Sequence, residues 1–191
     1  MRSRTRWANV FFLLAALGLA AVGASARASQ SAPQPSKTRS PAHYQAWLEK
    51  EVRHQLVLLP YYSVFDNLEF KVEGDRVLLM GQVVRPTLKS DAEAAVKKIE
   101  GVTGVENRIE VLPASMNDDR LRLALFRATY SNAMLSRYAI QAVPPIHIIV
   151  KGGHATLEGV VASEADKNVA YIQASSVPGV FSVTNHLRVE K

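Results

Sequence analysis

The chain has 191 residues, of which 48% are apolar and 21% charged, a composition typical of a folded globular protein with one ordinary domain or two small ones. Cysteine is absent, which excludes disulfides, thiolate metal sites and a catalytic thiol. Four of the 23 basic residues lie in residues 1–28, which hold no acidic residue, so the remaining chain has 19 basic against 17 acidic residues. So small a net charge disfavours general nucleic-acid binding, which needs a concentrated basic surface.

Residues 1–28 have the pattern of a secretory signal peptide. A basic MRSRTR segment precedes an uncharged apolar run, and Ala26-Arg27-Ala28 has the small-x-small form that signal peptidase accepts. We expect cleavage after Ala28, with Ala26 as the second choice. The alternative is an uncleaved N-terminal anchor, because the uncharged stretch from Trp7 to Ala26 has 20 residues, about the length that spans a bilayer. Both alternatives predict export, and we expect the periplasm, with membrane association if the segment is retained.

Residues 29–42 predict a flexible tether. They hold three prolines, four serines and no large apolar side chain, so they cannot bury enough surface to offset the entropy lost on ordering. The folded part of the chain is therefore expected to begin at residue 43.

Residues 43–113 predict a module with the order helix, strand, strand, helix, strand. Apolar residues first recur at every fourth position, as on one face of a helix, and then alternate with polar ones, as in a half-buried strand. Gly74-Asp75 provides a hairpin turn, and Gly101 ends the second helix. The apolar positions that define these elements are Leu48, Val52 and Leu56; Leu68, Phe70 and Val72; Val77, Leu79 and Val83; Leu88, Ala92, Ala95 and Ile99; and Val105, Ile109 and Val111.

The same module is written a second time further along the chain. With Gly74 aligned to Gly152 and no gap, 12 of the 46 positions from Asp66 to Val111 are identical, and an internal repeat of this kind outranks other sequence signals. The repeated positions that we expect to serve the architecture are Gly74, Gly81, Gly101 and Asn107 in the first copy and Gly152, Gly159, Gly179 and Asn185 in the second. Because Gly81 and Gly159 occupy strand centres, we expect a helix or a backbone to approach closely there.

Residues 117–190 therefore predict a second module with the same order of elements. Phe126, Tyr130 and Met134 mark its first helix, which Asp118 or Asp119 is expected to cap. Residues 163–166 resemble a capping box at the start of its second helix. The fold class predicted is α+β: two tandem αββαβ modules, each a three-stranded mixed sheet with two helices on one face.

The repeated pattern resembles the BON domain. The motifs are VEGDRVLLMGQV with GVTGVENRIEV in the first copy, and VKGGHATLEGV with GVFSVTNHLRV in the second. Two tandem copies behind a signal peptide are similar to osmotically inducible periplasmic BON proteins and their outer-membrane-associated relatives. The resemblance implies a non-enzymatic envelope protein that is associated with phospholipid surfaces, envelope integrity and stress protection.

One departure from the family concerns the loop between the first helix and the first strand. Family members often carry an Asp just before the first strand, whereas this chain has LLPYY at 58–62 and RYAI at 137–140. We therefore expect an atypical loop in both modules.

The sequence gives little support for a catalytic site or a metal-binding site. The five histidines are His43, His54, His147, His154 and His186. Only His147 and His154 are expected near each other, on the two arms of one hairpin, and no acidic cluster joins them, although a metal site usually needs three or four ligands. We therefore expect no catalytic residue, no metal, no cofactor, no small-molecule substrate and no nucleic-acid partner.

Two surfaces are candidates for binding. The first helix of the second copy is basic and carries aromatic residues, which favours peripheral contact with anionic phospholipid; the residues expected in this contact are Arg120, Arg122, Arg127, Arg137 and Tyr138. The outer sheet faces carry apolar residues that favour a protein interface, expected at Leu78, Met80, Val84 and Ile149. The alternatives are a solvated basic helix face in the first case and packing of the two repeats against each other in the second. The function predicted is phospholipid binding, with a periplasmic adaptor or scaffold as the alternative.

Overall fold

The computed structural model describes residues 41–190. The expected signal peptide and residues 29–40 of the expected tether lie outside the described residues, and the first helix begins at Pro41. Among the described residues, no helix combines the length and apolarity needed to cross a membrane.

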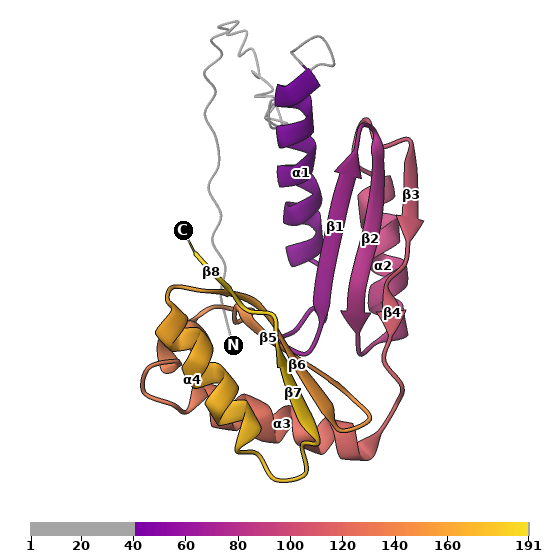
Figure 1. Ribbon diagram of the computed structural model, residues 1–191. Coiled ribbons are helices and arrows are strands. Elements are labelled where there is room, and N and C mark those ends of the chain that lie inside the picture. The colour runs from indigo at the N-terminus through magenta and orange to yellow at the C-terminus, as the bar shows by residue number, and fades with distance from the viewer. Residues whose placement is uncertain (1–40, 191) are drawn as a thin grey trace, which may run out of the picture. The chain divides into compact units, whose positions relative to one another are not determined.

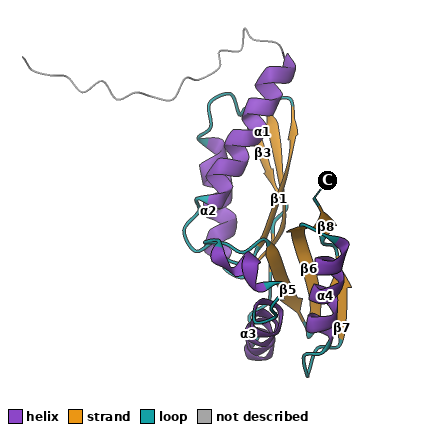
Figure 2. Ribbon diagram, turned by 90° about the vertical axis from the view of Figure 1, so that its left-hand side faces the viewer, coloured by secondary structure: helices purple, strands orange, loops and turns teal. Residues whose placement is uncertain are grey.

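The first module contains two helices and a small sheet (Figure 1). Its elements are α1 (Pro41–Val57), β1 (Asn67–Glu73), β2 (Arg76–Val83), α2 (Pro86–Lys97), β3 (Gly104–Asn107) and β4 (Glu110–Val111). Strand β1 is antiparallel to β2, and β2 pairs in parallel with both β3 and β4. Helices α1 and α2 lie on the same face of this sheet (Figure 2), and the predicted mixed sheet with two helices on one face is confirmed.

The second module repeats this topology. Its elements are α3 (Met116–Tyr130), the short 3-10 helix η1 (Ser136–Ile140), β5 (Ile146–Lys151), β6 (His154–Val161), α4 (Glu164–Ser175), β7 (Ser182–Asn185) and β8 (Arg188–Val189). Strand β5 is antiparallel to β6, which pairs in parallel with β7 and β8. The α+β class and the αββαβ order of both modules are therefore confirmed.

The last strand of each module is interrupted, which the sequence did not predict. The side chain of Asn107 accepts a hydrogen bond from the amide of Ile109 (3.1 Å) and donates one to the carbonyl of Lys89 on α2 (2.9 Å). Asn185 makes the same two bonds in the second module, with Leu187 and Lys167. The repeated asparagine thus turns the strand locally and ties it to the preceding helix.

The repeated strand glycines leave room for a neighbouring backbone. Gly81 has φ +104° and Gly159 has φ +121°. A Cβ at either position would clash with a main-chain carbonyl oxygen of the adjacent strand region, that of Asn67 or Pro145. The expected close approach is confirmed, and the approaching group is backbone.

Two of the helices start at a capping serine. Ser163 caps α4 and accepts a hydrogen bond from the amide of Asp166, as the capping box predicted. The expectation for α3 was wrong, because Ser115 caps it and Asp118 lies inside its first turn. Met134 lies beyond the end of α3.

Each module has its own hydrophobic core, and the second core includes a segment of the first module. Val64 and Phe65, from the loop between α1 and β1, pack with the buried residues of the second core. The amide of Ile148 on β5 donates a hydrogen bond to the carbonyl of Val64 (2.8 Å). The α1–β1 loop of the first module therefore completes the second module at the outer edge of β5.

Candidate functional site

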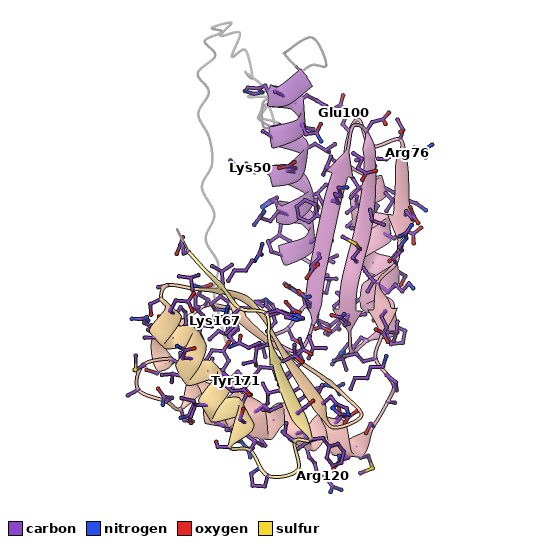
Figure 3. All side chains as sticks on the ribbon, in the orientation of Figure 1. Lys50, Arg76, Glu100, Arg120, Lys167 and Tyr171 are labelled. Carbon is purple, nitrogen blue, oxygen red and sulfur yellow. The ribbon has the colours of Figure 1, made fainter. Side chains whose placement is uncertain are left out.

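Helix α3 has a buried face and an exposed stripe of residues. Its inner face includes Leu121 and Leu125, which are part of the second core. The outer stripe contains Met116, Arg120, Leu123 and Arg127, whose spacing of four, three and four residues places them on one side of a helix. Met116 is 77% exposed and Leu123 49% exposed. Figure 3 shows Arg120 on α3.

Two of the five expected lipid-contacting residues lie on this stripe, Arg120 and Arg127. Both are exposed, and neither forms an ion pair with a described residue. Their charges are therefore available to an anionic ligand.

Arg122 is not available to such a ligand. It is only 3% exposed. Its guanidinium donates a hydrogen bond to the carbonyl of Val150 on β5 (2.7 Å) and pairs with the carboxylate of Asp119. The expectation that Arg122 contacts lipid was therefore wrong, because its charge is compensated within the module, where it joins α3 to the sheet.

Arg137 and Tyr138 belong to a polar cluster at the start of α4. The carboxylate of Asp166 accepts hydrogen bonds from Arg137, from the phenol of Tyr138 (3.0 Å) and from the hydroxyl of Ser163 (2.7 Å). Burial opposes ionisation of Asp166, but these hydrogen bonds and the positive charge of Arg137 outweigh it and lower the pKa of the carboxyl group. Because Arg137 and Tyr138 lie in η1 and already have partners, they are weaker candidates for a lipid contact than Arg120 and Arg127.

The phenol oxygen of Tyr138 also accepts a backbone hydrogen bond that an aspartate accepts in the first module. The carboxylate of Asp66, directly before β1, accepts a hydrogen bond from the amide of Val84 (2.8 Å). At the equivalent position of the second module, the amide of Ala162 donates instead to the phenol oxygen of Tyr138 (2.8 Å). Asp66 also accepts from the amide and hydroxyl of Ser63. The first module therefore has an aspartate immediately before its first strand, and the expected departure from the family pattern applies to the second module.

The expected interface residues lie on or near the outer sheet faces. Leu78 and Met80 are half-buried and alternate along β2 with core residues. Val84, just beyond β2, is also half-buried, and Ile149 is only 5% exposed. The side chains of Leu78, Met80 and Val84 are therefore partly accessible to a partner protein, whereas that of Ile149 is accessible only if the module rearranges.

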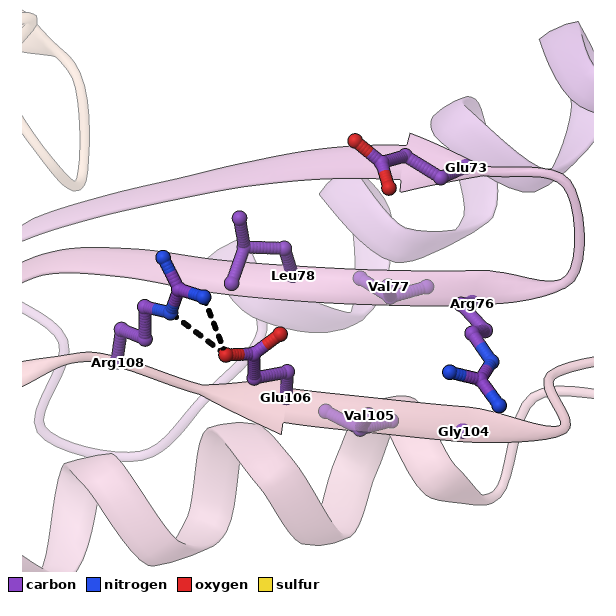
Figure 4. Close-up of a pocket in the computed structure, with 8 residues that line it drawn as sticks. All are labelled: Glu73, Arg76, Val77, Leu78, Gly104, Val105, Glu106 and Arg108. Atoms are coloured by element: carbon purple, nitrogen blue, oxygen red, sulfur yellow. Dashed lines mark hydrogen bonds and ion pairs between the residues drawn. The ribbon is translucent and has the colours of Figure 1, made fainter.

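A shallow groove runs over β2 and β3 on the outer face of the first sheet. Its volume is about 530 Å³. Leu78 lies in it between charged residues, and the carboxylate of Glu106 pairs with Arg108 at 2.6 Å (Figure 4). The remaining lining residues are Glu73, Arg76, Val77, Gly104 and Val105. Charged side chains surround Leu78 in the groove, whereas Val77 and Val105 pack with the first core beneath it.

The described histidines are dispersed. His147 stacks on Tyr62, with the ring centroids 5.7 Å apart, whereas His154 contacts Ser182 and His186 contacts Glu158. Burial lowers the pKa of His147, against the opposing influence of Asp66 and a Ser63 backbone hydrogen bond. Within residues 41–190, no three His, Cys, Asp or Glu side chains are placed to hold a metal ion.

The solved structures compared with this chain resemble it only weakly. Two solved structures of CdsD, a structural protein of the type III secretion system of Chlamydia trachomatis, align with 75% of this chain. The first is 13% identical, is covered over 92% of its own length and has a TM-score of 0.28. The second, of the C-terminal domain, is 12% identical, is covered over 98% and has a TM-score of 0.27. Likeness at these scores carries no argument, and no curated protein sequence matches the chain.

The informative match is to a protein family. The model of the BON domain family matches residues 44–113 and again residues 132–191, which together make up more than half of the chain. The first segment covers nearly all of the first module, and the second covers the second module from residue 132 onward, without α3. The chain therefore belongs to the BON family and is a tandem BON-domain protein.

Proposed function

We propose that this protein is a non-enzymatic, exported envelope protein that binds anionic phospholipid surfaces peripherally through the outer stripe of α3. The observation that carries the proposal is the stripe itself, in which Arg120 and Arg127 alternate with the exposed side chains of Met116 and Leu123. Membership of the BON family supports it, because the family suggests a phospholipid-binding, envelope-associated role.

The physical basis is the combination of charge and apolar surface on one helix face. Each arginine near an anionic membrane surface contributes about 1 kcal/mol, so the pair contributes about 30-fold in partition. The apolar side chains add a contribution from burial in the interfacial region. Because the inner face of α3 is buried in the core, the helix can lie on a membrane without unfolding the module.

Vesicle flotation tests the proposal. We expect the exported chain, with its N-terminus established by mass spectrometry, to float with vesicles containing phosphatidylglycerol and to remain behind with phosphatidylcholine vesicles. Binding should weaken as salt rises, because screening shortens the range of exposed charges. The double variant R120Q/R127Q should lose about 30-fold in partition at low salt.

The control is the double variant R76Q/R188Q, which removes two exposed arginines from the sheets and leaves α3 intact. It should bind like the parent. Equal recovery of the parent with neutral and anionic vesicles would exclude the electrostatic mechanism, and equal loss in both double variants would show that net charge, not α3, determines binding.

A second candidate function is that of a protein adaptor, which the groove over β2 and β3 favours. Leu78 and Met80 lie outside the buried core of the first module, so replacing both with serine should release a partner in a pull-down without changing the thermal midpoint. A lowered midpoint would instead show that these side chains stabilise the fold.

A further inference from the structure

Phe181 is an aromatic residue that the second module holds at its surface. Its side chain is 75% exposed, although its backbone is fixed by a hydrogen bond from its amide to the carbonyl of Gly153 (2.9 Å). Its ring lies 5.8 Å from the ring of His154, centroid to centroid. The backbone of Phe181 is therefore held in position, while its ring is accessible to a ligand.

The two modules differ at both residues of this contact. At the equivalent positions of the first module, the same backbone hydrogen bond joins the amide of Thr103 to the carbonyl of Asp75 (2.9 Å). In the second module, glycine replaces the aspartate and phenylalanine replaces the threonine. A Cβ at Gly153 would lie only 2.6 Å from the ring of Phe181, so a glycine at residue 153 makes room for the ring.

The ring lies at the end of the module where α3 begins. The carboxylate of Asp118, in the first turn of α3, accepts hydrogen bonds from the amides of Gly152 and Gly153 at the tip of the β5–β6 hairpin (both 2.9 Å). Phe181 rests on that tip. The exposed residues Met116 and Arg120 flank Asp118 in sequence, so the same end of the module presents apolar and positively charged groups.

We propose that Phe181 is the side chain that enters the interfacial region of an anionic bilayer when the outer stripe of α3 docks on it. This inference rests on the proposed function and adds an apolar contact from outside α3. A membrane is the favoured occupant because Arg120, at the same end of the module, matches an anionic surface. An aromatic ring is also well suited to the boundary between head groups and acyl chains.

The variant F181S tests this contact in the exported full chain. On phosphatidylglycerol-containing vesicles, partial burial of a phenylalanine predicts a loss of roughly ten-fold in partition. The loss should persist at high salt, because burial of apolar surface is not screened, whereas the loss in R120Q/R127Q should fade. The control is I172S, which removes an apolar side chain that is 59% exposed on α4 and should bind like the parent.

A second variant locates the side chain directly. In F181W, the difference spectrum against the parent cancels the native tryptophans and reports residue 181 alone. With anionic vesicles its emission should shift to shorter wavelength and be quenched by brominated acyl chains. The same substitution at Ile172 should give no shift.

The outcomes separate the two proposals. If the parent does not float with anionic vesicles, the proposed function fails and the inserted ring fails with it. If the parent floats and F181S floats equally well, or if F181W shows neither shift nor quenching, the ring does not enter the membrane and the proposal for α3 stands alone. Unchanged thermal midpoints in all variants confirm that binding, not folding, was altered.

Discussion

Single residues that the sequence places among surface or repeat positions turn out to have defined structural tasks. Arg122 is an example, since a charged residue on a basic helix predicts a surface position, yet its side chain is buried. The repeat contained a signal for this burial, because Arg122 aligns with an aromatic residue, Tyr44, in the first copy. In the structure Tyr44 packs against the first core. The partners of the buried guanidinium, Val150 and Asp119, depend on tertiary structure and could not be predicted from the pattern.

Gly81 and Gly74 allow a matched test at the residue scale. Both have positive φ, but a Cβ at Gly74 would meet no atom within 4 Å, whereas one at Gly81 would clash with the carbonyl of Asn67. We expect G74A to lower the free energy of unfolding by about 1–2 kcal/mol, the cost of the left-handed conformation. G81A should lower the free energy of unfolding by about 2 kcal/mol more than G74A does, because a clash with main chain cannot be relieved by a rotamer change. Chemical denaturation measures both, and equal costs would contradict a role for close backbone approach.

At the scale of elements, hydrophobic periodicity and the repeat predicted the αββαβ order of both modules. They did not predict η1, and they extended the first helix of the second copy past Tyr130, where α3 ends. The interruption between β3 and β4 was not predicted, because it depends on the side chain of Asn107 bonding to α2, a contact that periodicity does not contain. The stripe on α3 was predicted only in part: its charges were recognised, but Arg122, Arg137 and Tyr138 could be assigned to internal contacts only from the structure.

The contact between the α1–β1 loop and β5 should depend on pH. Burial lowers the pKa of His147 below its ordinary value of 6.5, so the unfolded chain binds a proton more readily than the folded one. The contribution of neutral His147 to stability is therefore complete above pH 6.5 and is lost as pH falls below that value towards the lowered pKa. The thermal midpoint of the parent should fall over this range.

The variant H147Q should lose part of that pH dependence, whereas H154Q, at an exposed histidine, should keep it. Thermal unfolding between about pH 4.5 and 7.5 makes the comparison. Parallel curves for the parent and H147Q would show that His147 does not govern the dependence.

At the scale of the whole molecule, the two modules share one segment of chain. Val64 is buried in the second core although it precedes the first strand of the first module. We expect V64A to lower the free energy of unfolding of the second module by about 1–3 kcal/mol, because the lost methyl groups leave a cavity. V57A, at a valine that is exposed in α1, should change it by less than about 0.5 kcal/mol. Chemical denaturation followed by near-UV circular dichroism measures the difference, and equal effects would show that the segment is dispensable.

This sharing makes the two copies unequal despite their repeated sequence pattern. A gene fragment that encodes residues 114–190 alone would produce a protein lacking two of the side chains that fill its interior, together with the carbonyl that accepts the hydrogen bond from Ile148. A fragment that ends at residue 113 would keep its interior complete and would instead expose Val64 and Phe65 to water. Recombination between such genes would therefore preserve the pair more readily than either half, and the order of the copies could not be reversed without rebuilding the loop after α1.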